Sequence, residues 1–91
     1  MGYLLRAKPK QMLQDSLTGE IIDAAIKVHK VLGPGLFESV YEEVLTYELT
    51  KKKRLVERQV VVPVYYEDLK MDVGFRADLL VDKEVIVEIK S

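Results

Sequence analysis

The stretch EVIVEIKS, at residues 84–91, alternates polar and apolar side chains along most of its length. Read as a β-strand, it places Glu88 and Lys90 together on one face. The opposite face is wholly apolar and consists of Val85, Val87 and Ile89. These two opposite charges belong either to a solvated sheet face or to a functional site. The register of pairing with the neighbouring strand determines which other residues share their face.

The preceding strand, expected over residues 70–81, fixes the register of that pairing. In an antiparallel pair, residues opposite each other share a face, and their numbers have a constant sum. A three-residue loop sets Val81 opposite Val85, and this register collects the apolar residues on one face: Phe75, Ala77, Leu79, Val81, Val85, Val87 and Ile89. A two-residue loop would divide them and lose several kcal/mol of burial, at about 1.5–3 kcal/mol for each large side chain. The favoured register sets Asp78 directly opposite Glu88.

An α+β domain in the order ααβββ is expected over residues 17–91. Thr18 can cap a first helix, which the Gly-Pro-Gly turn at residues 33–35 ends. A second helix is expected over residues 37–53. Residues 1–16 show no strong period and are interpreted as an N-terminal extension.

From residue 56 the hydrophobic period changes to two, which predicts three strands, over residues 56–66, 70–81 and 84–90. Pro63 cannot donate a ladder hydrogen bond, so the first of these strands is expected to lie at a sheet edge.

Length and composition restrict the function classes. The chain has 91 residues, enough for a single domain with a modest core. It has no cysteine, which excludes disulfides, thiolate catalysis and cysteine-ligated zinc and suits the cytoplasm, where we expect the protein. The longest apolar run, residues 60–66, is far shorter than the ~20 residues of a membrane helix, so no membrane association is expected.

The charge of the chain is nearly balanced but unevenly spread. A net charge of −1 argues against a dedicated, high-affinity nucleic-acid binder. One basic run nevertheless stands out, at Lys51, Lys52, Lys53 and Arg54. Such a run is commonly a solvated helix end, where cations suit the negative end of the helix dipole. The alternative is a weak, non-specific contact with a nucleic-acid backbone.

Two carboxylates directly opposite each other on a sheet repel, so Asp78 and Glu88 need a compensating charge. Arg76 and Lys90 can supply it as simple salt bridges. The alternative is a divalent cation, because carboxylate oxygens are the hard ligands that Mg²⁺ and Mn²⁺ prefer. Lys90 would then lie beside the metal and orient an attacking water, an arrangement suited to phosphodiester hydrolysis.

Two motifs carry a resemblance to a known family. Asp78, nine further residues and then Glu88-Ile89-Lys90 resemble the D…ExK signature of the PD-(D/E)XK nuclease superfamily. Residues 28–43 resemble the GxxExxY protein family, named for the positions Gly35, Glu38 and Tyr41. Three other segments are also similar to that family, at residues 57–59 (ERQ), 63–66 (PVYY) and 74–80 (GFRADLL).

The resemblance implies a restriction-endonuclease-like core, αβββαβ, with a metal-dependent nuclease site. Asp78 and Glu88 would match the metal carboxylates, and Lys90 the catalytic lysine. Glu38 would match a helix-borne acid that serves as a further metal ligand or holds water. Gln59, on the first strand after the helices, is a further catalytic candidate facing the same cleft. By contrast, Glu42 and Glu43 are interpreted as ordinary helix-surface charges.

The sequence also departs from the superfamily pattern, since only Ser91 follows the ExK strand where a helix and a strand are expected. We therefore expect a core that lacks these two C-terminal elements. An uncovered strand edge and apolar face would favour a homodimer or a higher oligomer. Two functions remain open: a Mg²⁺- or Mn²⁺-dependent nuclease acting on DNA or RNA, and a non-catalytic interaction or structural module with a degenerate site. A third, more remote interpretation is a surface acid cluster that binds adventitious cations without turnover.

Overall fold

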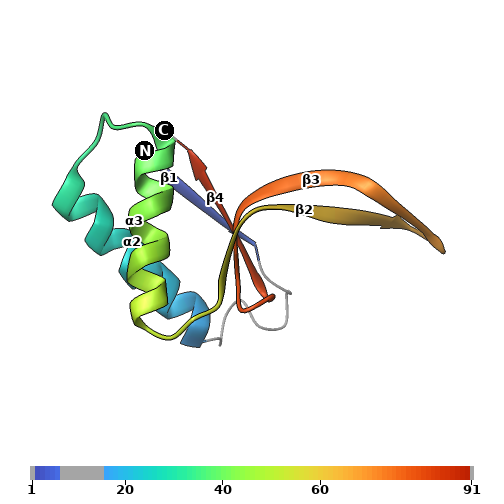
Figure 1. The fold of residues 1–91 in the computed structure, drawn as a ribbon, viewed down its shortest axis with the longest axis horizontal. Helices are drawn as coiled ribbons and strands as arrows, with labels where there is room; N and C mark the ends of the chain where they lie inside the picture. Colours follow the sequence, from blue (N-terminus) through green and yellow to red (C-terminus); the bar gives the residue numbers. More distant parts are fainter. Residues whose placement is uncertain (1, 7–15, 91) are drawn as a thin grey trace.

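The computed structural model describes residues 2–6 and 16–90, which form an α+β fold (Figure 1). The elements are β1 (Gly2–Arg6), α2 (Ser16–Leu32), α3 (Glu38–Lys51), β2 (Val56–Tyr66), β3 (Leu69–Val81) and β4 (Val85–Lys90). The predicted order of two helices followed by three strands is confirmed, and β1 is an additional strand that precedes them. Helix α2 begins two residues before Thr18, which is buried inside the helix instead of capping it.

The described strands form one antiparallel sheet in the order β1-β4-β3-β2. Val81 pairs with Val85 and Leu79 with Val87, so the register selected by hydrophobicity is confirmed. The predicted apolar face is buried at Ala77, Leu79, Val81, Val85, Val87 and Ile89. Strand β2 lies at a sheet edge, as its proline predicts.

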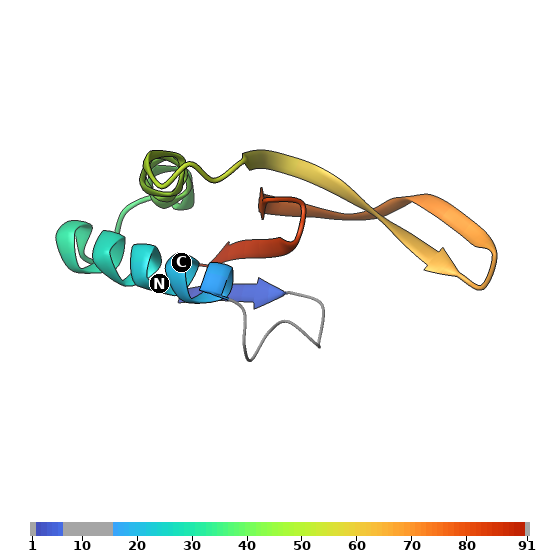
Figure 2. The same cartoon turned by 90° about the horizontal axis from the view of Figure 1, so that it is seen from below.

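Helices α2 and α3 cover this apolar face (Figures 1 and 2). Their contribution to the core is a set of side chains at helical spacing: Leu17, Ile21, Ala24, Ala25, Val28, Tyr41, Leu45 and Leu49. Removing these side chains from water is the main stabilising term, at about 25 cal/mol for each Å² of apolar surface. The expectation of an uncovered apolar face is therefore wrong for the body of the sheet.

For residues 2–6, strand β1 corrects the interpretation of residues 1–16 as an N-terminal extension, whereas residues 7–15 lie outside the described part of the chain. It pairs antiparallel with β4, from Gly2 opposite Lys90 to Arg6 opposite Ile86. The sequence of β1 shows no strong period and therefore does not predict a strand. The strand forms because the edge of β4 offers backbone N–H and C=O groups that need hydrogen-bond partners. Strand β1 occupies this edge of β4, so the edge is not exposed for self-association.

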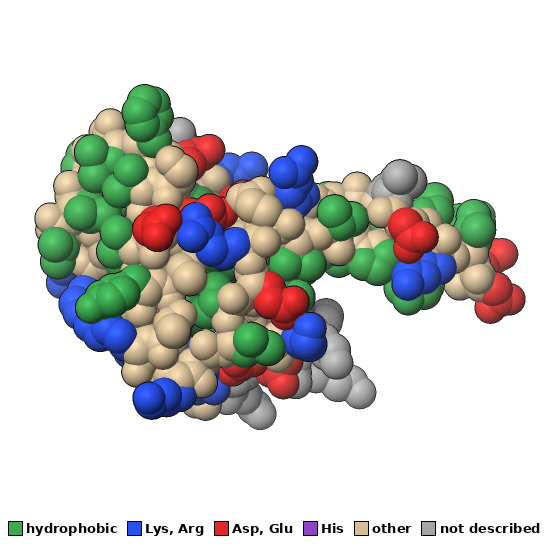
Figure 3. Space-filling model, in the orientation of Figure 1, with side chains coloured by type: hydrophobic (Ala, Val, Ile, Leu, Met, Phe, Trp, Pro, Cys, Tyr) green, Lys and Arg blue, Asp and Glu red, His purple; other side chains and the backbone are tan. Residues whose placement is uncertain are grey.

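Strands β2 and β3 continue beyond the body as a twisted two-stranded arm (Figures 1 and 3). Their pairing shifts register between Val62 and Val64, where β3 carries the extra residues. Gly74 lies in this shift, and a Cβ at that position would come within 1.8 Å of the Val62 carbonyl oxygen. Only glycine therefore allows the two backbones to approach so closely.

Neither of the two described helices combines the length and the apolar character that crossing a lipid bilayer requires.

Candidate active site

Asp78 lies where β3 and β4 stop pairing. The last paired residues before it are Leu79 and Val87. Beyond them, the Asp78 carboxylate accepts a hydrogen bond through Oδ2 from the backbone N–H of Ile89, at 2.7 Å. If the β3–β4 ladder continued, this N–H of β4 would donate to a backbone carbonyl of β3. The Asp78 side chain replaces that carbonyl as the acceptor. As a result, Asp78 is held in the gap between the two strands.

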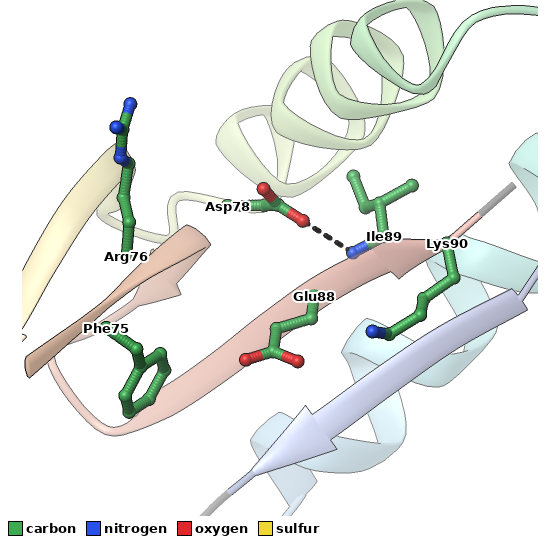
Figure 4. Close-up of a pocket in the computed structure, with 6 residues that line it drawn as sticks. All are labelled: Phe75, Arg76, Asp78, Glu88, Ile89 and Lys90. Atoms are coloured by element: carbon green, nitrogen blue, oxygen red, sulfur yellow. Dashed lines mark hydrogen bonds between the residues drawn. The ribbon is translucent and has the colours of Figure 1, made fainter.

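A hollow of about 450 Å³ opens at this gap and is lined by Phe75, Arg76, Asp78, Glu88, Ile89 and Lys90. In Figure 4 the Asp78 side chain lies above β4 and reaches toward the Ile89 nitrogen, whereas Glu88 and Lys90 project below. The structure therefore brings together the three residues of the predicted D…ExK site. The expected face-to-face arrangement of the two carboxylates is modified, because Asp78 turns toward the β4 backbone.

A second hollow, of about 150 Å³, adjoins the first and is lined by Glu38, Ser39, Glu42, Gln59, Asp78 and Ile89. Asp78 and Ile89 line both hollows, so they form the boundary between them. Glu38 reaches the second hollow from the first turn of α3. Glu38, Gln59, Glu88 and Lys90 thus each share a hollow with Asp78.

Gln59 connects α3 to this carboxylate. Its amide Nε2 donates to Glu42 Oε1 at 2.6 Å and makes a longer contact with Asp78 Oδ1 at 3.4 Å. Its backbone φ is 53°, in the left-handed region, although it lies inside a strand. For a residue other than glycine this conformation costs about 1–2 kcal/mol. Such local strain is typical of functional sites, where the surroundings hold it in place.

Glu42 lines the second hollow, although it is interpreted from the sequence as a helix-surface charge. It is buried rather than a surface charge, with a side chain only 9% exposed. Arg58 donates to Glu42 Oε2 at 2.8 Å, and this hydrogen bond raises the pKa of the guanidinium above its usual value. One signal was available: Glu42 follows Glu38 by four residues, so both lie on the same side of the helix.

Tyr41 fixes the loop that leads into α3. The ring is fully buried, and its hydroxyl donates to the Gly33 carbonyl oxygen at 2.5 Å. The same hydroxyl accepts a hydrogen bond from the backbone N–H of Leu36, at 3.2 Å. The start of the helix that carries Glu38 is therefore anchored to the loop before it.

The donor set is of the kind that binds a hard divalent cation, because Asp78, Glu88 and Glu38 all offer carboxylate oxygens. A carboxylate has about four acceptor positions, so the contacts of Asp78 with Ile89 and Gln59 leave room for a further ligand. Within residues 2–6 and 16–90, however, no group of three acidic or histidine side chains is already arranged to hold a metal ion. The residues fit the chemistry, and metal binding requires a side chain to turn toward Asp78.

The basic run lies away from this site. Glu38 begins α3 and Lys51 ends it, which separates them by about 20 Å at 1.5 Å rise per residue. Arg54 is partly buried and bonds to Glu20 and to Asp82 Oδ2, the latter at 3.0 Å. It joins the start of α2 to the β3–β4 loop. Lys52 and Lys53 are exposed.

Two helices pack against an antiparallel sheet of the described strands, and Asp78, Glu88 and Lys90 line one hollow. This arrangement is consistent with a restriction-endonuclease-like fold. The family model of the PD-(D/E)XK nuclease superfamily matches residues 15–91. The chain therefore belongs to that superfamily. Searches of curated proteins and of solved structures gave no significant match.

Proposed function

We propose that this chain is a Mg²⁺- or Mn²⁺-dependent nuclease domain that hydrolyses phosphodiester bonds of DNA or RNA. The observation that carries the proposal is the shared position of Asp78, which lines one hollow with Glu88 and Lys90 and a second with Glu38 and Gln59. Membership of the superfamily supports a nuclease role.

The proposed roles follow from the chemistry of each side chain. Asp78 and Glu88 would hold the cation, and Glu38 would add a third carboxylate by turning toward Asp78. A divalent cation at such a site supplies a nucleophile at neutral pH and offsets charge on the phosphate. The Lys90 ammonium would hold the attacking water by hydrogen bonding and attract the anionic phosphate.

Finer assignments belong to the same proposal. The motif of Gly35, Glu38 and Tyr41 supports membership of the GxxExxY family. Lys52 and Lys53 are available for weak contacts with a nucleic-acid backbone, whereas Arg54 is already engaged in ion pairs. A cytoplasmic location and a homodimer or higher oligomer remain predictions. Light scattering of the purified protein tests the oligomer directly, and a stable monomer would contradict it.

Cleavage assays test the nuclease proposal. The wild type, Glu88→Ala and Lys90→Ala are incubated with single- and double-stranded DNA and RNA in Mg²⁺ or Mn²⁺. Lys83→Ala, on the exposed loop between β3 and β4, is the matched lysine control. We expect cleavage by the wild type and the control, and its loss in the two site variants with folding intact. A well-folded but inactive wild type would contradict the proposal.

One observation favours the alternative of a non-catalytic interaction module. Asp78 already accepts from the Ile89 backbone N–H, and its other oxygen contacts the Gln59 amide. These contacts stabilise the fold without a metal ion. If the alternative holds, the inactive wild type will lose stability on Asp78→Ala but will bind neither cation.

A further inference from the structure

We propose that Glu42 is a positioning residue that fixes Asp78 through the amide of Gln59. The inference deepens the proposed function and rests on it for its metal-binding consequence. The structural part stands on the described contacts between α3, β2, β3 and β4, and is tested separately from metal binding.

The first step is the immobility of Glu42. Its side chain is 9% exposed and accepts hydrogen bonds on both oxygens, from Arg58 at 2.8 Å and from Gln59 at 2.6 Å. Burial of a carboxylate in this way is tolerated because Arg58 compensates its charge. The Oε1 atom of Glu42 is therefore a fixed acceptor at the rim of the second hollow.

The second step is the orientation of the Gln59 amide, which lies between two carboxylates. Ionised carboxylates only accept hydrogen bonds, so both Glu42 and Asp78 must be met by the NH₂ end of the amide. This end is 2.6 Å from Glu42 Oε1 and 3.4 Å from Asp78 Oδ1. The charged Glu42 thus selects one of the two amide orientations and directs the Gln59 donor toward Asp78.

The third step is the effect on Asp78, whose two oxygens are met from different elements. Oδ2 accepts from the Ile89 backbone N–H on β4, while Oδ1 faces the Gln59 amide on β2. These contacts fix the plane of the carboxylate, which leaves its remaining acceptor positions aimed at a defined place. Partners of this kind orient metal ligands, and their loss typically weakens metal binding about 10–100-fold.

Glu48 provides a matched control for Glu42. It lies on the same helix, its side chain is also 9% exposed, and it accepts a hydrogen bond from Lys27 at 2.6 Å. It does not line either hollow. Glu42→Gln and Glu48→Gln therefore remove the same charge from the same helix at similar burial, and only the first faces Gln59.

The Ile89 backbone amide reports on Asp78 without any metal. We expect Glu42→Gln and Gln59→Met to shift the proton resonance of the Ile89 amide and to speed its hydrogen exchange. Asp78→Ala removes the acceptor entirely, so it should change both in the same direction and by more. Glu48→Gln is expected to leave the resonance unchanged and to speed exchange no more than its loss of global stability accounts for. Gln59 is exposed, so if Glu42→Gln does not fold, an unchanged Ile89 amide in Gln59→Met would still overturn the proposal. An unchanged Ile89 amide in the folded site variants would overturn the proposal.

The double variant separates action through Gln59 from a direct effect. If Glu42 acts through Gln59, adding Glu42→Gln to Gln59→Met will not enlarge the change at the Ile89 amide. Additive changes would show that Glu42 acts on Asp78 by another route, which would overturn the proposed pathway.

Mn²⁺ titration tests the consequence for the proposed function. We expect the dissociation constant for Mn²⁺ to rise about 10–100-fold in Glu42→Gln and to stay unchanged in Glu48→Gln. An equal dissociation constant in wild type and Glu42→Gln would contradict the inference alone. A wild type that binds no Mn²⁺ would contradict the proposed function, while the amide resonances would still decide whether Glu42 positions Asp78.

Discussion

At the scale of single residues, Asp78 combines a structural and a proposed chemical role. Its carboxylate accepts a backbone hydrogen bond from Ile89 at the point where the ladder ends, and it borders both hollows. Strand alternation and register predict that Asp78, Glu88 and Lys90 lie close together, and the three residues line one hollow. The same rules do not predict the Gln59 bridge, because a left-handed φ inside a strand breaks the alternation.

Glu48 gives a prediction about pH. The hydrogen bond from Lys27 lowers the pKa of Glu48 below its usual 4.5, opposed by partial burial and aided by Lys51. A carboxylate with a lowered folded-state pKa stabilises the fold above its unfolded pKa, and this contribution is lost as pH falls through the folded value. The difference in unfolding free energy between wild type and Glu48→Gln should therefore shrink below pH 4.5.

Urea unfolding at a series of pH values measures this difference. The titration starts at neutral pH, where the Glu48 contribution is complete, and continues well into the acid range. A difference between the two proteins that stays constant throughout would show that the Lys27–Glu48 pair does not contribute in this way.

At the scale of elements, the sheet shows which features a sequence can specify. The β3–β4 register followed from burial alone, because the alternative would expose several large side chains. The pairing of β1 could not be predicted in this way, because β1 is short and has no strong period. Only its hydrogen bonding to β4 identifies it as a strand. The register shift in the arm is marked only by Pro63 and Gly74.

Gly74 in the arm is crowded by the facing strand, whereas Gly19 in α2 has open space around it, and substituting both by alanine tests the close approach in the arm. Gly74→Ala would place a Cβ 1.8 Å from the Val62 carbonyl oxygen, and we expect it to destabilise the β2–β3 pairing by about 1–3 kcal/mol. Gly19 is inside α2 with open space around it, so Gly19→Ala should stabilise by about 0.5–1 kcal/mol. Chemical denaturation measures both changes. A Gly74→Ala protein as stable as the wild type would contradict the described close approach.

At the scale of the whole molecule, ion pairs join elements that are distant in sequence. Arg54 links Glu20 on α2 with Asp82 after β3, and Asp82 also accepts a hydrogen bond from the Leu55 backbone N–H at 2.8 Å. This group secures the helical layer to the sheet at the end opposite Glu38. The basic run predicted from the sequence thus contains a cation whose contacts are internal.

Arg54→Ala and Lys52→Ala distinguish stability from nucleic-acid contact. We expect Arg54→Ala to lower the free energy of unfolding by about 1–3 kcal/mol, because two partly buried carboxylates lose their partner. Lys52 is exposed, so Lys52→Ala should leave stability unchanged and slightly weaken non-specific binding of an oligonucleotide. Thermal unfolding and fluorescence anisotropy measure the two effects. An Arg54→Ala protein of unchanged stability would exclude the proposed structural role.

The central claim is that Asp78 anchors a divalent-cation site, and a calorimetric titration with Mn²⁺ tests it most directly. Asp72→Ala serves as the control, because this aspartate lies on the arm with a side chain 86% exposed. We predict saturable Mn²⁺ binding by the wild type and by Asp72→Ala, and its loss in Asp78→Ala with the fold intact. No binding to the wild type, or equal binding to folded Asp78→Ala, would contradict the claim.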